Sequence, residues 1–305
     1  MIRLKAVQLV YAYYQNEGKA IDVAEKEYLF SLGKAYDLYQ YLLTVLVRLR
    51  AIAEQKEAAA AARQRRLGTV AGGPTPDACL AANKFLAQLA ANKFLVEYIE
   101  KQRQEWIEEE AILKKLYAKF VETDIMQLYL TKEDFSYEAD RELVRKLYKT
   151  CVCNNDDFDA MLEDHSLYWN DDKDIVDSFV LKTIKRFTED STEEQPLLPE
   201  FAADEDREFA VNLFRLTLEK GAETRQLIRD NSKNWEFSRL AFMDVIIMQL
   251  ALTEMLSFPG IPLNVTFNEY LDIAKVYSTP RSASYINGLL DAIVKKLKAD
   301  NLLLK

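Results

Sequence analysis

The side chains that could carry metal chemistry lie in the middle third of the chain. Residues 156–159 and 171–174 each hold three aspartates, the carboxylate density of a cation site. Neither cluster has the glycine and the terminal glutamate of a calcium-binding loop, so we interpret both as solvated acidic turns. Cys151, Cys153 and the one histidine, His165, lack the number and spacing of zinc ligands. We therefore expect no metal, no cofactor and no catalytic centre.

The net charge of the chain is −9, and it is unevenly distributed. Residues 133–209 have 23 acidic and 9 basic side chains, whereas residues 257–305 have 4 acidic and 6 basic ones. A general nucleic-acid coat would be basic throughout, so the charge argues against that class of protein. The excess of bases near the C-terminus is compatible with one local basic face.

The elements that must position any binding residues are predicted to be helices. The chain has only 8 Gly and 7 Pro among 305 residues, and it is rich in good helix formers. No series of alternating β-branched runs predicts a sheet. No apolar run approaches the roughly 20 residues of a membrane span. Three cysteines are too few for a disulfide framework. We therefore expect an all-α, cytoplasmic protein.

Hydrophobic periodicity and turn residues divide the chain into helices. A first helix is predicted over residues 2–16 and a long one over about 23–66, followed by a Gly- and Pro-containing loop at 67–77. An acidic, Pro-containing linker is predicted at 188–205. The rest is predicted to form four helices: 206–230, 237–257, one that begins at Asn264, and one that begins at Ser282 or Ser284.

An internal repeat has a period of 66 residues. Residues 138–184 align without a gap on residues 204–250, and Trp169 matches Trp235. Each copy is predicted to be a helix, a turn with the pattern Ser-x-x-Trp, and a second helix. We expect both tryptophans to anchor a core. Two copies are too few for a solenoid, so the repeat predicts packed helical hairpins.

Three motifs resemble, in order and in spacing, segments of the NusB family of bacterial transcription antitermination factors. The first is RLKAVQLVY at residues 3–11, the second is Asn-Glu-x-x-x-x-Ala-Lys at 268–275, and the third is SYINGLLD at 284–291. The resemblance covers residues 2–16 and about 206–298.

The family resemblance implies an all-α, NusB-like helical bundle, here extended by additional helical hairpins. Residues 1–17 would be the first helix of the core, and residues 206–305 its C-terminal part. Residues 18–205, which include the first copy of the repeat, would be a helical insertion that is atypical of the family.

The resemblance also implies a function. It implies an RNA-binding transcription antitermination factor, without enzymatic activity, that binds the boxA element of ribosomal RNA transcripts. The implied partners are a NusE-type small-subunit ribosomal protein and, indirectly, the RNA polymerase elongation complex. No association with a membrane is implied. Such RNA is single-stranded, so cations would bind phosphates and an aromatic ring would stack on a base. The chain lacks the Gly-rich strand–turn–helix that would bind a methyl donor.

The resemblance places RNA-binding residues in the first helix and in the turn before the last helix: Arg3, Lys5, Gln8, Arg281, Ser282 and Tyr285. The cations would contact phosphates, the glutamine a base edge, and the tyrosine a base face. Asp244, on the helix 237–257, is expected at an exposed edge and would meet the basic ribosomal protein. Asn268 and Asn287 are expected to bond a neighbouring backbone or helix, and Gly288 to permit close helix contact.

A second interpretation stays open. The chain would then be a helical scaffold that keeps the NusB fold, binds protein through its acidic middle and does not bind RNA. RNA affinity that falls steeply with salt would favour the first interpretation. Protein association that is insensitive to salt, without RNA binding, would favour the second.

Overall fold

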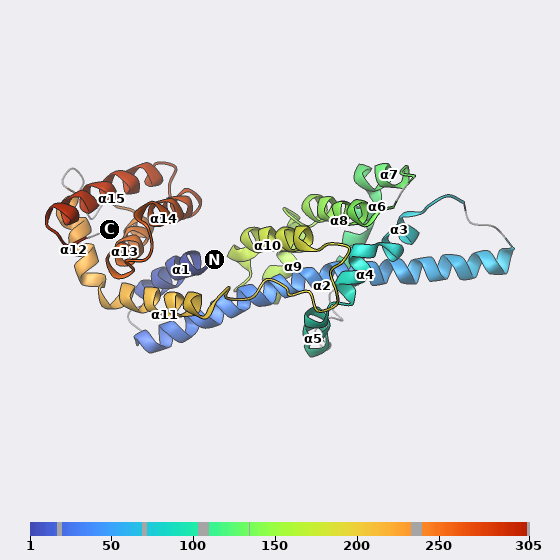
Figure 1. Ribbon diagram of the computed structural model, residues 1–305, viewed down its shortest axis with the longest axis horizontal. Coiled ribbons are helices and arrows are strands. Elements are labelled where there is room, and N and C mark those ends of the chain that lie inside the picture. Colours follow the sequence, from blue (N-terminus) through green and yellow to red (C-terminus); the bar gives the residue numbers. More distant parts are fainter. Residues whose placement is uncertain (17–19, 69–71, 103–109, 134, 233–239, 304–305) are drawn as a thin grey trace. The chain divides into compact units, whose positions relative to one another are not determined.

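The computed structural model describes residues 1–16, 20–68, 72–102, 110–133, 135–232 and 240–303. Every regular element in these ranges is a helix, so the predicted all-α class is confirmed (Figure 1). The chain divides into two compact units: unit 1 is Met1–Gly33 with Phe201–Lys305, and unit 2 is Lys34–Glu200. No helix in the described ranges has both the length and the apolarity needed to cross a bilayer.

Unit 1 contains the first helix, the start of the second and the five C-terminal helices. These are α1 (Ile2–Gln15), residues 21–33 of α2 (Ile21–Leu67), α11 (Asp204–Glu219), α12 (Gly221–Asn231), α13 (Phe242–Ser257), α14 (Leu263–Tyr277) and α15 (Ser282–Ala299). Three acidic residues in the first turn of α11 complement the positive end of its dipole. Pro262 directly precedes α14, and its fixed φ suits a helix start.

The single helix predicted over 206–230 is in fact two helices, because the chain breaks between Glu219 and Gly221. Gly221 is buried, and a Cβ atom there would lie 2.6 Å from the Tyr14 hydroxyl and 3.0 Å from Gln249 Nε2. Side chains from α1 and α13 thus approach the backbone so closely that they would have to shift to admit a larger residue.

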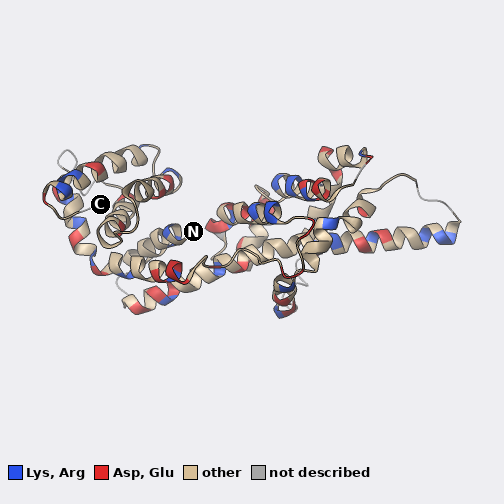
Figure 2. Ribbon diagram, viewed as in Figure 1, with Lys and Arg blue, Asp and Glu red and all other residues tan. Residues whose placement is uncertain are grey.

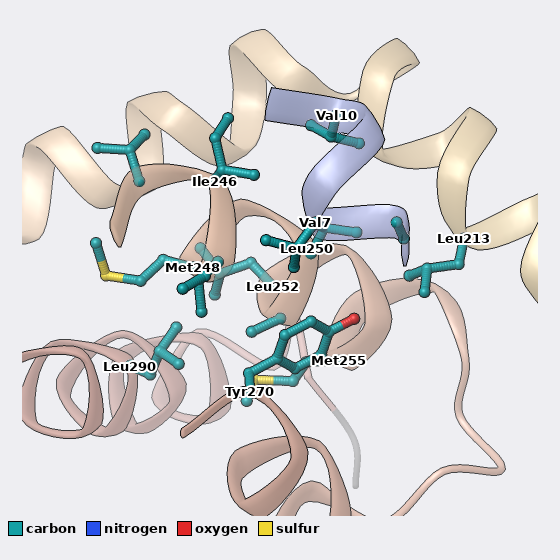
Figure 3. Close-up of a cluster of buried hydrophobic side chains, with 14 of the residues drawn as sticks. Val7, Val10, Leu213, Ile246, Met248, Leu250, Leu252, Met255, Tyr270 and Leu290 are labelled. Carbon is teal, nitrogen blue, oxygen red and sulfur yellow. The ribbon is translucent and has the colours of Figure 1, made fainter. Parts of the chain in front are cut away.

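α13 is the central helix of unit 1. Every residue from Asp244 to Met255 is buried, as expected of a helix that is apolar on nearly all sides. The core around it includes side chains from all six other helices of unit 1, among them Val7 and Val10 of α1, Leu213 of α11, Tyr270 of α14 and Leu290 of α15 (Figure 3). This core joins the first helix to the end of the chain.

Unit 2 contains residues 34–67 of α2 and nine further helical elements. These are α3 (Pro76–Ala82), α4 (Lys84–Ala90), α5 (Lys93–Lys101), α6 (Glu110–Glu122), α7 (Asp124–Leu130), α8 (Tyr137–Cys151), α9 (Asp156–His165), the 3-10 helix η1 (Asn170–Asp172) and α10 (Lys173–Arg186). Six of these helices, several of them short, have a polar side chain that caps the N-terminus by accepting a backbone N–H bond: Thr75, Asn83, Asn92, Thr123, Ser136 and Asn155.

In the described part of the chain, the first copy of the repeat contains α8, α9, η1 and α10, and the second contains α11, α12 and α13. The prediction of two helices per copy is therefore wrong, because the chain breaks once more within each first segment. Trp169 is buried, as predicted, and its indole N–H donates to the Lys34 carbonyl oxygen at 2.9 Å. Its counterpart Trp235 lies outside the described residues, as do parts of the predicted loop 67–77 and of the predicted helix 237–257.

Unit 2 contains a charged network that is buried except at Asp159, the Lys173 cluster, formed by Lys173, Tyr148, Asp159 and Asp177. The Lys173 ammonium group lies 2.8 Å from Asp177 Oδ2, 3.2 Å from Asp159 Oδ1 and 3.0 Å from the Val152 carbonyl oxygen. The Tyr148 hydroxyl donates to Asp177 Oδ1 at 2.5 Å. Burial alone would lower the pKa of Lys173, but the charges and hydrogen bonds of the two aspartates leave that pKa raised. The ammonium group therefore stays charged inside the unit.

Candidate nucleic-acid interface

Arg3 lies near the start of α1, where its guanidinium group binds carboxylates of α13 and α14. Its Nε donates to Glu254 Oε2 at 2.8 Å and its Nη2 to Glu254 Oε1 at 3.1 Å, and Nη1 lies 3.6 Å from Glu269 Oε2. The fully buried Glu254 also accepts from Thr266 Oγ1 at 2.7 Å and from the Tyr270 hydroxyl at 3.2 Å. These five residues form the Arg3 cluster, which ties three helices together.

The two cations of the first helix that are predicted to bind phosphate, Arg3 and Lys5, are largely inside unit 1. Burial lowers the pKa of Arg3, but hydrogen bonding and charge from Glu254 outweigh that effect and leave the pKa raised. Lys5, on the same helix, has only 4% of its surface exposed. Neither residue is a freely exposed cation, because the first helix packs its charged positions against the core. Their contact with RNA stays a prediction.

Gln8 connects α1 to the end of α14. Its Nε2 lies 3.5 Å from the Tyr277 hydroxyl, a long hydrogen bond, and its side chain is partly buried. Tyr277 is the last residue of α14 and directly precedes the turn at 278–281. The first helix and this turn therefore lie in the same part of unit 1.

Asp244 and Ser282 hold the turn before α15 from inside. Asp244 Oδ2 accepts from Ser282 Oγ at 2.8 Å, and Asp244 Oδ1 accepts from Ser278 Oγ. Ser282 Oγ also accepts the Thr279 N–H at 3.2 Å. Ser282 is only 3% exposed, so its hydroxyl group is directed inward. Its predicted RNA contact has no support from this geometry and stays a prediction.

The expectation that Asp244 lies at an exposed edge of its helix is wrong, because its side chain is buried, with 5% exposed. Periodicity places a residue beside the buried face at the helix edge only if the helix has a solvent-facing side. α13 has almost none over its length. A contact of Asp244 with a partner protein stays a prediction, and the carboxylate acts in this structure as an acceptor for the turn.

Arg281 and Tyr285 have different environments although they are one turn apart. Arg281 is exposed at the N-cap of α15, and it forms no ion pair with the described part of the chain. Tyr285 is partly buried and packs against the core of unit 1, so burial, with the charge of Asp244, raises the pKa of its hydroxyl group. Arg281 is available to a phosphate, whereas base stacking on Tyr285 stays a prediction.

The motif asparagines and Gly288 are not used by the fold. Asn268 and Asn287 are both exposed, and their side chains form no hydrogen bond with the described residues, so the expectation of an internal partner is wrong. Gly288 is also exposed, and a Cβ there would meet no atom within 4 Å. Its predicted close helix contact is therefore wrong as well.

Together these observations define one exposed polar surface, the α15 face, which consists of Arg281, Ser284, Asn287, Gly288 and Asp291. Figure 2 shows that α15 has both acidic and basic residues along its length. The opposite side of the helix is buried against the core. Periodicity predicts this face, because its residues recur every three or four positions between buried apolar ones. Sequence reasoning missed it by treating the motif positions as structural.

Comparison with known proteins shows to which family the chain is similar. A model of the NusB family matches residues 175–295, a range that includes the turn and most of α15. The match begins inside residues 18–205, so the insertion boundary predicted from the sequence stays a prediction. No solved structure matches the chain.

Three bacterial proteins, each described as a transcription antitermination protein NusB, are similar to the chain. The protein of Salinibacter ruber is 43% identical over 97 residues, which are 31% of this chain and 61% of that protein. The protein of Geobacter sp. (strain M21) is 37% identical over 40% of this chain and 83% of its own length. The protein of Geotalea daltonii is 34% identical over 43% of this chain and 88% of its own length.

Proposed function

We propose that this chain, which belongs to the NusB family, is a transcription antitermination factor that binds boxA-type single-stranded RNA with a NusE-type ribosomal protein. The family membership supports the antitermination role, since the relatives are described by it. The chain spans 61% of the Salinibacter ruber protein, so the activity, RNA and partner of a whole relative are part of this proposal.

The observation that carries the proposal is the α15 face. A single strand of RNA offers phosphates and unpaired base edges. Arg281 is an exposed cation for a phosphate, and the Asn287 amide can both donate to and accept from a base edge. Glycine inside a helix costs roughly 0.5–1 kcal/mol relative to alanine. Gly288 gains no packing in return, as expected where a ligand must approach the backbone closely.

The direct test is a titration of the full chain with a boxA-like RNA and with a scrambled strand of the same composition. Both titrations are done with and without the NusE-type ribosomal protein. We expect tighter binding of the boxA-like strand, at least in the presence of the partner. Equal affinity for the two strands in both conditions would overturn the proposal. Salt-insensitive binding of protein without RNA would instead support the scaffold interpretation.

Two substitutions test the α15 face itself. Arg281→Ala should weaken binding of both strands and reduce the salt dependence of log K by about 0.7. Asn287→Ala should reduce the preference for the boxA-like strand several-fold. The matched control is Asn212→Ala, which removes an exposed asparagine from α11 of the same unit. If Asn212→Ala and Asn287→Ala have the same effect, the α15 face does not read the RNA.

A further inference from the structure

The C-terminal end of α2, in unit 2, is helical but buries little surface. Most of its residues from 54 onward are exposed: Glu54, Gln55, Lys56, Ala58, Ala59, Ala60, Ala62, Arg63, Arg65, Arg66 and Leu67. In Figure 1 this end of α2 extends beyond α3 and α4. Helices in proteins are stabilised mainly by packing, but this one relies on a run of alanines, the best helix formers. The fold of unit 2 does not account for so much exposed helix.

The exposed end of α2 has a local excess of positive charge. Residues 58–76 contain three arginines and no acidic residue, in a chain whose net charge is −9. At about 100° per residue, Arg63, Arg66 and Lys56 fall within roughly 80° of one another around the helix. Glu54 and Glu57 fall about 120–180° away from Arg63. We call the positive side the α2 basic face, and it consists of Lys56, Ala59, Ala60, Arg63 and Arg66.

The groups of the α2 basic face are open to a ligand. Arg63 and Arg66 are exposed and form no ion pair within the described ranges of the chain. Lys56 lies 4.7 Å from the Tyr117 ring centroid, yet its side chain remains exposed. The alanines between the cations add little height to the surface, so an extended ligand can reach the cations along about 15 Å of helix.

We propose that the α2 basic face binds the phosphate backbone of RNA without reading its sequence. Arginine presents a planar fork that matches phosphate oxygens, and cations spaced along a helix suit a chain of phosphates. The inference rests on the proposed function in taking RNA as the ligand. It goes beyond that function because it places a contact in unit 2, outside the segment that matches the family model.

The test uses the full chain, the boxA-like RNA and the scrambled strand. Arg63→Ala/Arg66→Ala should weaken binding of both strands equally, by about tenfold or more at ~0.1 M salt, and reduce the salt dependence of log K by about 1.4. The preference between the strands should not change. Unchanged affinity and salt dependence would overturn the inference. The inference would also be overturned if the double variant keeps its RNA affinity and loses only the binding of an acidic protein.

Two controls separate a phosphate contact from general charge and from helix stability. Lys146→Ala/Lys149→Ala removes two exposed cations from α8 and changes the net charge equally, so it should have little effect. Arg65 and Arg66 both lie in the last turn of α2, but only Arg66 is on the basic face. Arg66→Ala should therefore weaken RNA binding more than Arg65→Ala, at similar helix content by circular dichroism. Equal losses in either comparison would overturn the inference.

The same data separate this inference from the proposed function. If the wild-type chain binds both strands alike and Arg63→Ala/Arg66→Ala weakens both, the boxA proposal fails and the α2 basic face stands. If the chain prefers the boxA-like strand and this double variant has no effect, the boxA proposal stands and the α2 basic face fails.

Discussion

The Arg3 cluster of unit 1 and the Lys173 cluster of unit 2 are built from the same components. Each contains a cation, two carboxylates and a tyrosine that donates its hydroxyl hydrogen to one of them. They differ in how far apart the partners lie along the chain. Arg3 and Glu254 are 251 residues apart, whereas Lys173 and Asp177 are four apart on α10. The first cluster joins distant segments, and the second fastens neighbouring helices.

The cations also differ in what they provide. The arginine forms a planar, bidentate pair with a carboxylate that is fully buried, and a lysine cannot reproduce that geometry. In the Lys173 cluster the Asp159 side chain is 35% exposed, so water can replace part of what the lysine provides. A basic residue that the sequence predicts to bind RNA can therefore be required by the fold itself.

The largest effect is expected at Arg3. Arg3→Ala leaves the buried Glu254 carboxylate without its cation, and removal of one member of a buried pair costs about 3–5 kcal/mol. The measurement is the free energy of unfolding in urea, and Arg3→Lys, which keeps the charge but not the fork, should lose less. A loss below about 1 kcal/mol for Arg3→Ala would contradict the comparison, since it would mean that water already solvates Glu254.

A smaller loss is expected in unit 2. Lys173→Ala removes the cation from Asp177, but that carboxylate keeps the Tyr148 hydroxyl and the cluster borders solvent at Asp159. We expect about 2–3 kcal/mol in the same urea experiment. If Lys173→Ala lowers the free energy of unfolding more than Arg3→Ala does, solvent exposure of the cluster does not determine the size of the loss.

The tyrosines of the two clusters make stability depend on pH in alkali. Burial first, and then the charge of Glu254 or Asp177, raise the pKa of Tyr270 and of Tyr148 well above the usual value. A raised folded pKa means that this stability is present below about pH 10 and is lost as the pH rises further, because the unfolded chain releases the proton first.

Each of these tyrosines should lower the free energy of unfolding by up to about 1.4 kcal/mol per pH unit as the pH rises above 10. Tyr270→Phe and Tyr148→Phe should each make the alkaline decline shallower by that amount, measured by urea unfolding between pH 9 and 11. The parallel between the clusters predicts equal changes. A slope that is unaffected by one substitution would separate the two sites.

The smallest effects compare the interior of unit 1 with its α15 face. Gly221→Ala forces a methyl group against the Tyr14 hydroxyl, and the Tyr14 ring is held by the Arg225 guanidinium at 3.7 Å, so we expect a loss of about 1–3 kcal/mol. Gly288→Ala meets no atom and should stabilise the chain by about 0.5–1 kcal/mol. Thermal unfolding measures both.

Gly288→Ala also bears on function. If RNA approaches the α15 face, the stabilised variant should bind the boxA-like strand more weakly than the wild type does. Unchanged RNA affinity together with higher stability would remove Gly288 from the interface.

The long helices were the part of the fold that periodicity could predict. The first helix, predicted over 2–16, is Ile2–Gln15, and the second, predicted over about 23–66, is Ile21–Leu67. The crowding at Gly221 could not be predicted, because the Tyr14 hydroxyl that approaches its backbone is more than 200 residues away in the sequence. Local patterns report local geometry, whereas this close approach is a result of tertiary packing.

The burial of the candidate site residues could not be predicted from local sequence either. Sequence types indicated that Arg3 is a cation and Asp244 an acid, but not that the first pairs with Glu254 or that the second holds Ser282. Both outcomes depend on α13 being enclosed. In contrast, the spacing of its residues could have predicted the α15 face. It was missed because asparagine and glycine were expected to serve packing.

The division of unit 1 into two distant chain segments has a consequence for biosynthesis. Unit 2 is continuous from residue 34 to 200, so a ribosome can release it for folding as one piece. The first helix must wait until α13 has been made, more than 200 residues later. At about 5–20 residues per second this wait is roughly 10–45 s, during which Ala6, Val7 and Val10 lack their final core. The nascent chain is therefore expected to need protection of its own N-terminus during synthesis.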